Sequence, residues 1–213
     1  MFNFSSSSLL TWALSIPGIL IAISFHEMAH GYAADAMGDP TPKMSGRLTL
    51  NPLKHIDPIG LLAMIVLRFG WAKPVPINPN NFKDRKKGMI VVALSGCLTN
   101  LILGLIGQAA YIAVIPLNND ILLTILQYIY YYNVLFAIFN LIPIPPLDGS
   151  RILAEFLTPS ARMKYESFSR YGFVVLLILM FTGLFSVIIV PLINGVLSLY
   201  YIILTPLIHL VVR

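Results

Sequence analysis

The stretch Phe25-His26-Glu27-Met28-Ala29-His30 decides the fold, because it places ionisable side chains inside a long apolar run. In an α-helix, residues four apart lie on one face, offset by roughly 40° around the axis and about 6 Å along it. Both imidazoles can therefore reach one ion, and two neutral imidazoles suit zinc, with positions left for a third ligand and a water. Glu27 is placed to take a proton from that water, as a general base does.

The surroundings of this pattern argue against a chance match. Residues 11–34 contain no other charged or imidazole side chain. Two histidines and a glutamate at hydrocarbon depth cost several kcal/mol unless a partner or a function retains them. The pattern therefore predicts a zinc site inside a membrane.

The composition indicates an integral membrane protein. Of 213 residues, 57% are hydrophobic and 11% are charged, and the mean hydropathy is +0.82, which excludes an ordinary soluble domain. The net charge of +5 fits the positive-inside bias of such proteins better than nucleic-acid binding. Residues 1–8 carry no Lys or Arg, so we expect no secretory signal peptide and a retained first span.

Hydropathy and turn residues predict an all-α polytopic protein with about five transmembrane helices. The predicted spans are residues 9–37, 88–115, 119–142, 171–190 and 192–212. Residues 58–70 are apolar but too few for a normal span, and they fit a re-entrant segment. Residues 43–50 alternate loosely and predict a short β element near the zinc helix. We expect a single domain over residues 1–213, with a core at 9–157 and extra C-terminal spans at 171–212.

Basic residues predict the orientation. The turn at residues 117–120 and the turn at Pro191 have no Lys or Arg, whereas residues 83–87 and 151–170 are rich in them. The positive-inside rule places the basic segments in the cytoplasm. If residues 58–70 are re-entrant, every basic loop is inside, the N-terminus is outside and the C-terminus is cytoplasmic.

Zinc needs a third protein ligand, usually His, Asp or Glu. Asp148 is the strongest candidate, because it follows an apolar span and a Pro-rich turn and precedes Gly149, which lets backbone approach closely. His55 and Asp57 stay possible. His26, His30 and Asp148 share one depth only if the first and third spans run in the same direction. That again requires residues 58–70 not to cross the bilayer.

The chain resembles the site-2 protease family of intramembrane zinc metalloproteases, in its compact branch without a PDZ domain. The resemblance rests on motifs between residues 22 and 155: His-Glu-x-x-His at 26–30, the stretches 46–60 and 70–79, Ser-Gly-Cys-Leu-Thr-Asn at 95–100, and residues 139–149. The family usually has proline where Cys97 stands. That difference removes no predicted ligand.

The resemblance implies a zinc endopeptidase that cleaves membrane-protein substrates in or near their transmembrane segments. It implies one Zn²⁺ held by His26, His30 and Asp148, Glu27 as catalytic base, and Asn100 and Asn140 at the substrate. It also implies the lipid bilayer as surroundings, in a prokaryotic cell membrane. The alternative from another class is a zinc-binding transporter or scaffold without proteolysis, which would need ligands but no base beside them.

Overall fold

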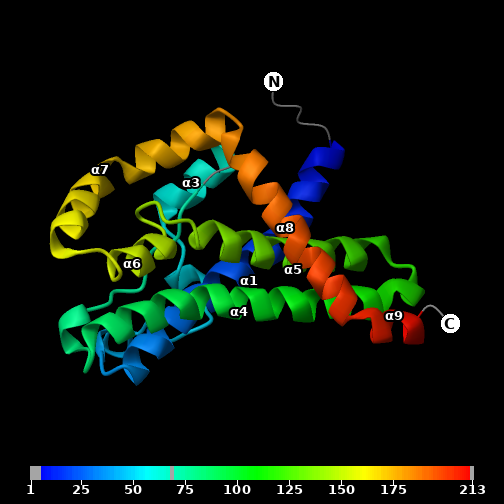
Figure 1. The fold of residues 1–213 in the computed structure, drawn as a ribbon. Coiled ribbons are helices and arrows are strands. Elements are labelled where there is room, and N and C mark those ends of the chain that lie inside the picture. Colours follow the sequence, from blue (N-terminus) through cyan, green and yellow to red (C-terminus); the bar gives the residue numbers. More distant parts are fainter. Residues whose placement is uncertain (1–5, 68–69, 212–213) are drawn as a thin grey trace.

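The computed structural model describes residues 6–67 and 70–211, so residues 68–69 of the predicted re-entrant segment and residue 212 of the last predicted span lie outside it (Figure 1). The described part is helical. Its α-helices are α1 (Ser6–Ala36), α2 (Thr41–Met44), α3 (Pro58–Leu67), α4 (Arg85–Val114), α5 (Asp120–Asn140), α6 (Asp148–Ala154), α7 (Pro159–Phe181), α8 (Leu184–Ile203) and α9 (Thr205–Val211).

Four described helices are long and apolar enough to cross a membrane: Leu10–Ala36, Arg85–Leu117, Asp120–Asn140 and Leu184–Ile203. The first three match the predicted spans at 9–37, 88–115 and 119–142. Helices α4 and α5 begin where Asp84 and Asn119 accept backbone N–H bonds in the first turn, as N-cap residues do. The protein is therefore a polytopic membrane protein.

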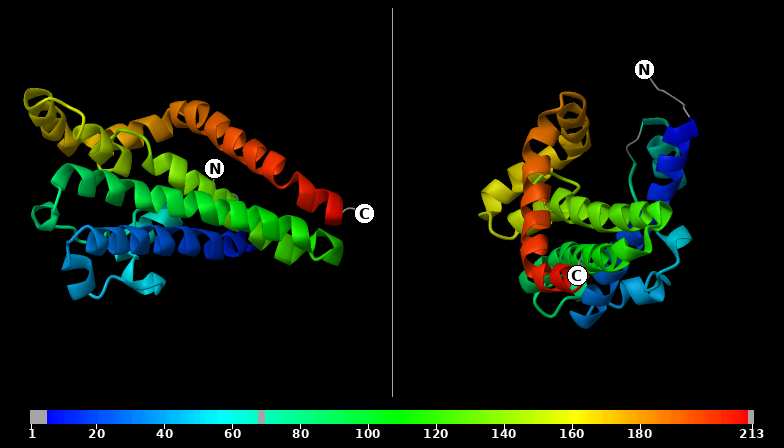
Figure 2. Two further views of the ribbon diagram at one scale, coloured as in Figure 1. Left: turned by 60° about the horizontal axis from the view of Figure 1, so that its bottom comes forward. Right: turned by 90° about the vertical axis from the view of Figure 1, so that its right-hand side faces the viewer.

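Helices α1, α4 and α5 pack on one another and form the core of the molecule (Figure 2). His30 of α1 contacts Val92 of α4, whereas Ala22 of α1 contacts Asn100 of α4. Residue numbers fall on one helix as they rise on the other, so α1 and α4 are antiparallel. The chain between them consequently leaves and re-enters the bundle on the same side.

Helices α1 and α5 run in the same direction. Gly18 of α1 approaches the backbone of Tyr128, and the His26 ring packs edge-on against Phe136, 5.0 Å away. The spacing of these contacts is equal on both helices. Helix α3 between α1 and α4 has only 10 residues, about half the length that spans a bilayer.

The predicted division of the C-terminal region was wrong. We expected spans at 171–190 and 192–212 separated by Pro191, but α8 continues through Pro191 and the break lies at Gly183. Gly183 has φ of +73°, a left-handed conformation that ends helices and suits glycine. Proline inside a membrane helix is tolerated when neighbouring groups satisfy the freed carbonyl. The structure thus has four candidate spans in its described part, rather than about five.

The predicted β element was also wrong. Residues 41–44 form helix α2, Gly46 turns the chain with φ of +63°, and an antiparallel bridge between Ile56 and Ala72 is isolated from any strand in the described residues. Pro42 in the first turn favours a helix start. The alternation at 43–50 was too weak to outweigh that proline and the left-handed glycine.

Candidate metal centre

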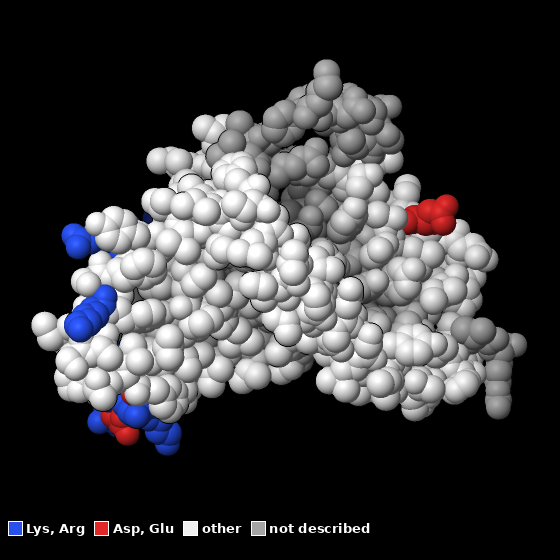
Figure 3. All heavy atoms as spheres, turned by 45° about the horizontal axis from the view of Figure 1, so that its top comes forward, with Lys and Arg blue, Asp and Glu red and all other residues white. Residues whose placement is uncertain are grey.

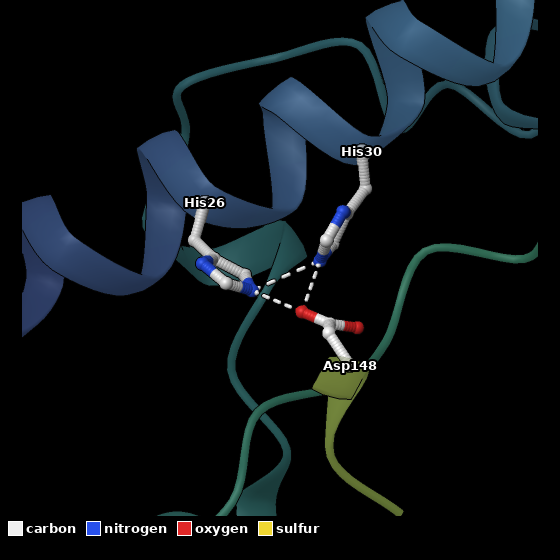
Figure 4. A group of neighbouring side chains, drawn as sticks. All are labelled: His26, His30 and Asp148. Carbon is white, nitrogen blue, oxygen red and sulfur yellow. Dashed lines mark hydrogen bonds and ion pairs between the residues drawn. The ribbon is translucent and has the colours of Figure 1, made fainter. Parts of the chain in front are cut away.

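Three side chains from two distant parts of the chain meet between α1 and the start of α6 (Figure 4). Nε2 of His26 and Nε2 of His30 each lie 3.0 Å from Oδ2 of Asp148. The two Nε2 atoms are 2.9 Å apart. All three residues are buried. Four-residue helical spacing brings the imidazoles together, and the parallel course of α1 and α5 brings Asp148 to their depth.

The outer nitrogens of both imidazoles face hydrogen-bond acceptors. Nδ1 of His26 lies 2.6 Å from Oδ1 of Asn100, and Nδ1 of His30 lies 2.7 Å from the carbonyl oxygen of Val92. A carbonyl can only accept, so each Nδ1 carries the proton. Each neutral ring then presents an unprotonated Nε2, the atom that binds metals.

This arrangement fits a metal ion. Nε2 of both imidazoles and Oδ2 of Asp148 converge within about 3 Å of one another, so all three donor atoms are directed at one point. Two imidazoles and a carboxylate are a common zinc donor set, in which ligand atoms around a tetrahedral ion lie roughly 3.3 Å apart. A small adjustment of the side chains would open the cluster to that spacing.

Gly96 of α4 makes room for the two imidazoles. A methyl group on its Cα would lie 2.7 Å from Cε1 of His26 and 2.7 Å from Cε1 of His30. Carbon atoms at ordinary van der Waals contact are 3.5–4.0 Å apart. Glycine at this position is therefore required by the site as it stands.

Glu27 shares a cavity of about 850 Å³ with the three converging residues. Its Oε2 accepts a hydrogen bond of 2.8 Å from the backbone N–H of Val75. The cavity wall is mainly apolar and comes from α1, α3, α5, α6, α7, α8 and residues 70–77. A carboxylate beside a metal-type cluster in an apolar cavity can serve as a base toward a water or a peptide group.

The two asparagines predicted at the substrate lie in different surroundings. Asn140 lines the cavity, and its Nδ2 donates to the carbonyl of Phe136 in its own helix. Asn100 is fully buried, and its amide bonds to His26, to the carbonyl of Ala22 and to Oδ1 of Asn133. Protein groups thus already satisfy the Asn100 amide.

The other candidate ligands lie outside the cluster of three. His55 lines the cavity, but its Nε2 bonds to the carbonyl of Thr49 at 2.7 Å. Asp57 accepts the N–H groups of Ile59 and Gly60 and so caps α3. These partners give both residues a structural role in the loop between α1 and α4.

Sequence reasoning missed three groups near the cluster. Asn133 supports Asn100 from α5, and its polarity within an apolar span was a signal that went unused. Arg151 lines the cavity with Nη1 3.8 Å from Oδ1 of Asp148. Val75 contributes its backbone N–H, which donates to Glu27, and the identity of its side chain gives no sign of this contact.

A bundle of membrane helices that holds a buried His-His-Asp cluster beside a glutamate indicates a membrane protein of the metalloprotease class. Comparisons with known proteins agree with this class. The model of peptidase family M50 matches residues 111–183. A Bacillus subtilis protein with the provisional name zinc metalloprotease YwhC is 36% identical over 184 residues, covering 83% of this chain and 84% of that protein.

Two further relatives carry the provisional name zinc metalloprotease Rip2. The protein of Mycolicibacterium smegmatis is 29% identical over 175 residues, covering 79% of this chain and 67% of its own length. That of Mycobacterium tuberculosis strain H37Rv is 25% identical over 172 residues, covering 79% and 66%. No solved structure matches the chain significantly. The chain belongs to peptidase family M50, the site-2 protease family of zinc metalloproteases.

Proposed function

We propose that this protein is an intramembrane zinc endopeptidase that cleaves peptide bonds in or near transmembrane segments of other membrane proteins. The observation that carries the proposal is the convergence of His26, His30 and Asp148 beside Glu27, inside a candidate span. At 1.5 Å per residue, His26 lies about 15 Å from the end of α1 at Ala36. A bilayer core is about 30 Å thick, so this depth is hydrocarbon depth.

In this proposal His26, His30 and Asp148 hold one zinc ion per chain. When bound, zinc polarises a carbonyl and makes a water more acidic. Glu27 accepts the proton of the attacking water and returns it to the leaving amine. Its carboxylate shares the cavity with the three ligand atoms, as a general base must.

Asn100 and Asn140 have separate roles in the same proposal. The bond between Nδ1 of His26 and Oδ1 of Asn100 fixes the tautomer and the ring orientation that a metal ligand needs. Asn140 lies in the cavity wall, where its amide is placed to bond to a substrate backbone. The sequence-based expectation put both at the substrate, and the contacts of Asn100 favour support of His26 instead.

The cavity suits an unwound apolar peptide segment. A transmembrane helix uses its carbonyls in its own hydrogen bonds, so a substrate must open locally before a carbonyl can be attacked. The wall facing the cluster is built largely of aliphatic and aromatic side chains, including Leu135, Phe136 and Phe139. Such a wall accommodates apolar side chains of a substrate without the loss of solvation that polar ones would suffer.

We also propose an orientation in the prokaryotic cell membrane. The Lys and Arg side chains on the face drawn in Figure 3 gather at one end of the molecule, and the positive-inside rule places that end in the cytoplasm. Helix α1 then starts outside. With four candidate spans, α8 ends on the side where α1 starts, so we place its C-terminal end outside, unlike the sequence-based expectation.

Cysteine labelling tests this orientation. In a Cys97→Ser background, cysteines at Ser45 and Lys83 should label from the cytoplasmic side, because both are exposed in the chain between α1 and α4. A cysteine at Leu117, exposed between α4 and α5, should label from the other side. Labelling of positions 45 and 83 from opposite sides would contradict the proposal.

The protease function is tested by Glu27→Gln. The amide cannot accept the proton, and general-base catalysis contributes roughly 10²- to 10⁴-fold, so cleavage should fall by that factor while zinc content stays near one ion per chain. Quantitative proteomics should find membrane-protein fragments that accumulate with the wild type and disappear with Glu27→Gln. Asp35→Asn is the matched control, with the same chemical change on α1 outside the cluster. Identical fragments with Glu27→Gln would favour a transporter or scaffold.

A further inference from the structure

The segment at residues 71–78, called here the strap, crosses the cavity wall beside Glu27. Its residues 72–78 contain no helix, and prolines at 74 and 76 flank Val75. Proline has no N–H and fixes φ near −65°, so Val75 presents an isolated backbone donor on a stiff chain. That donor lies 2.8 Å from Oε2 of Glu27, with both residues buried.

The strap is anchored on both sides of Val75. On one side, the N–H of Lys73 donates to the carbonyl of His55 at 2.8 Å, and the Lys73 carbonyl accepts from Nη2 of buried Arg47 at 2.5 Å. On the other side, the N–H of Asn78 donates to Oδ2 of Asp39 at 2.7 Å. The donor that meets Glu27 therefore stands between fixed points.

The Asp39 anchor is a carboxylate. Burial raises the pKa of Asp39, but hydrogen bonds from Thr41, Asn78 and Asn81 outweigh burial and lower it below its usual value. An ionised acceptor makes the stronger bond to an N–H group. The strap thus stays fixed at neutral pH.

From this geometry we infer that Val75 is a positioning residue for Glu27, an inference that rests on the proposed protease function. Its N–H holds Oε2, and this leaves the other carboxylate oxygen to accept the proton of the attacking water. A flexible glutamate at the edge of an apolar cavity would otherwise sample several rotamers. Arg47 contributes from a distance, because it fixes the strap that carries the donor.

Hydrogen exchange on the metal-free protein tests the contact itself. Only Ala72, Lys73, Val75, Ile77 and Asn78 carry exchangeable amides in residues 72–78, since 74 and 76 are prolines. We expect the Val75 amide to exchange more than about 10-fold faster in Glu27→Ala than in wild type, because the carboxylate acceptor is gone. Equal exchange at Val75 in both proteins would overturn the inference.

Kinetics test the positioning role. Val75→Pro removes the donor, and Val75→Ala is the reference that keeps it while shortening the side chain. Relative to Val75→Ala, we expect kcat in Val75→Pro to fall by about 10- to 100-fold, as for supporting partners of other metal sites, with KM and zinc content unchanged. Arg47→Met removes the donor to the Lys73 carbonyl, whereas Arg47→Lys keeps a donor, so kcat should likewise be lower in Arg47→Met than in Arg47→Lys. If Val75→Pro loses its zinc as well as its activity, the positioning role is contradicted. Equal kcat values in the proline and alanine variants would contradict it too.

A binding probe separates this inference from the proposed function. Acetohydroxamate chelates zinc and donates its hydroxyl proton to a neighbouring carboxylate, so its affinity for the zinc-loaded protein reports the position of Glu27 without any substrate. Val75→Pro should weaken this binding relative to Val75→Ala, and the difference should vanish in a Glu27→Gln background, because coupled residues are not additive. A difference that persists in that background overturns the positioning role. Absence of any cleavage by the wild type would instead overturn the proposed function.

Discussion

Asp148→Ala should remove zinc from the purified protein, with a loss of affinity greater than about 100-fold. Oδ2 of Asp148 is 3.0 Å from Nε2 of both His26 and His30, and it supplies the negative charge of the cluster. Removal of partners that merely orient zinc ligands already costs about 10- to 100-fold in affinity. Loss of a ligand itself should cost more. Zinc content and competition with a chelator measure the effect.

His55→Ala is the control for this experiment. His55 lines the same cavity but bonds to Thr49 rather than to the cluster. We expect the variant to keep its zinc, although the loop that His55 supports should be less stable. The opposite result, with zinc lost from His55→Ala and kept by Asp148→Ala, would show that the third ligand is misassigned.

Gly96→Ala should displace the histidines and weaken metal binding by more than about 10-fold. The added methyl group would meet two imidazole carbons at 2.7 Å, and overpacking of this kind costs about 1–3 kcal/mol. The rings can relieve the clash only by leaving the bonds that orient them, or by forcing α4 away from α1. Zinc titration of the folded variant measures the loss.

The matched control is Gly195→Ala, a second helical glycine, in α8. A methyl group there would meet nothing within 4 Å, so this substitution should leave zinc binding as it is. Alanine is also the better helix former, by about 1 kcal/mol. If Gly96→Ala binds zinc as tightly as Gly195→Ala does, the close approach of α4 is not what shapes the site.

The core of the fold could be predicted because its signals are local or depend on simple topology. The helical spacing of His26 and His30 indicated the helix that carries the predicted zinc site, and the long apolar runs indicated the first three spans. The meeting of Asp148 with the histidines followed from span direction, and the structure brings the three together. The ligand roles stay predictions until metal is measured.

The errors have equally physical causes. Proline is a strong helix breaker in water, so Pro191 looked like a boundary, but a membrane helix continues through it and Gly183 turns the chain instead. Residues 43–50 had too little alternation to specify a strand. The partner of Glu27 could not be predicted, because the donor is the main chain of Val75, 48 residues away, and a backbone group leaves no mark in composition or periodicity.

The contacts of Asn100 have a consequence for biogenesis. The ribosome delivers α1 first, with His26, Glu27 and His30 facing lipid before any helix can cover them. Asn100 arrives with α4 and meets both His26 and the carbonyl of Ala22, so lateral association with this second span gives His26 a polar partner. Asp148 is translated later still. A newly inserted chain therefore passes through a stage in which two of its spans are paired but the cluster of His26, His30 and Asp148 is still incomplete.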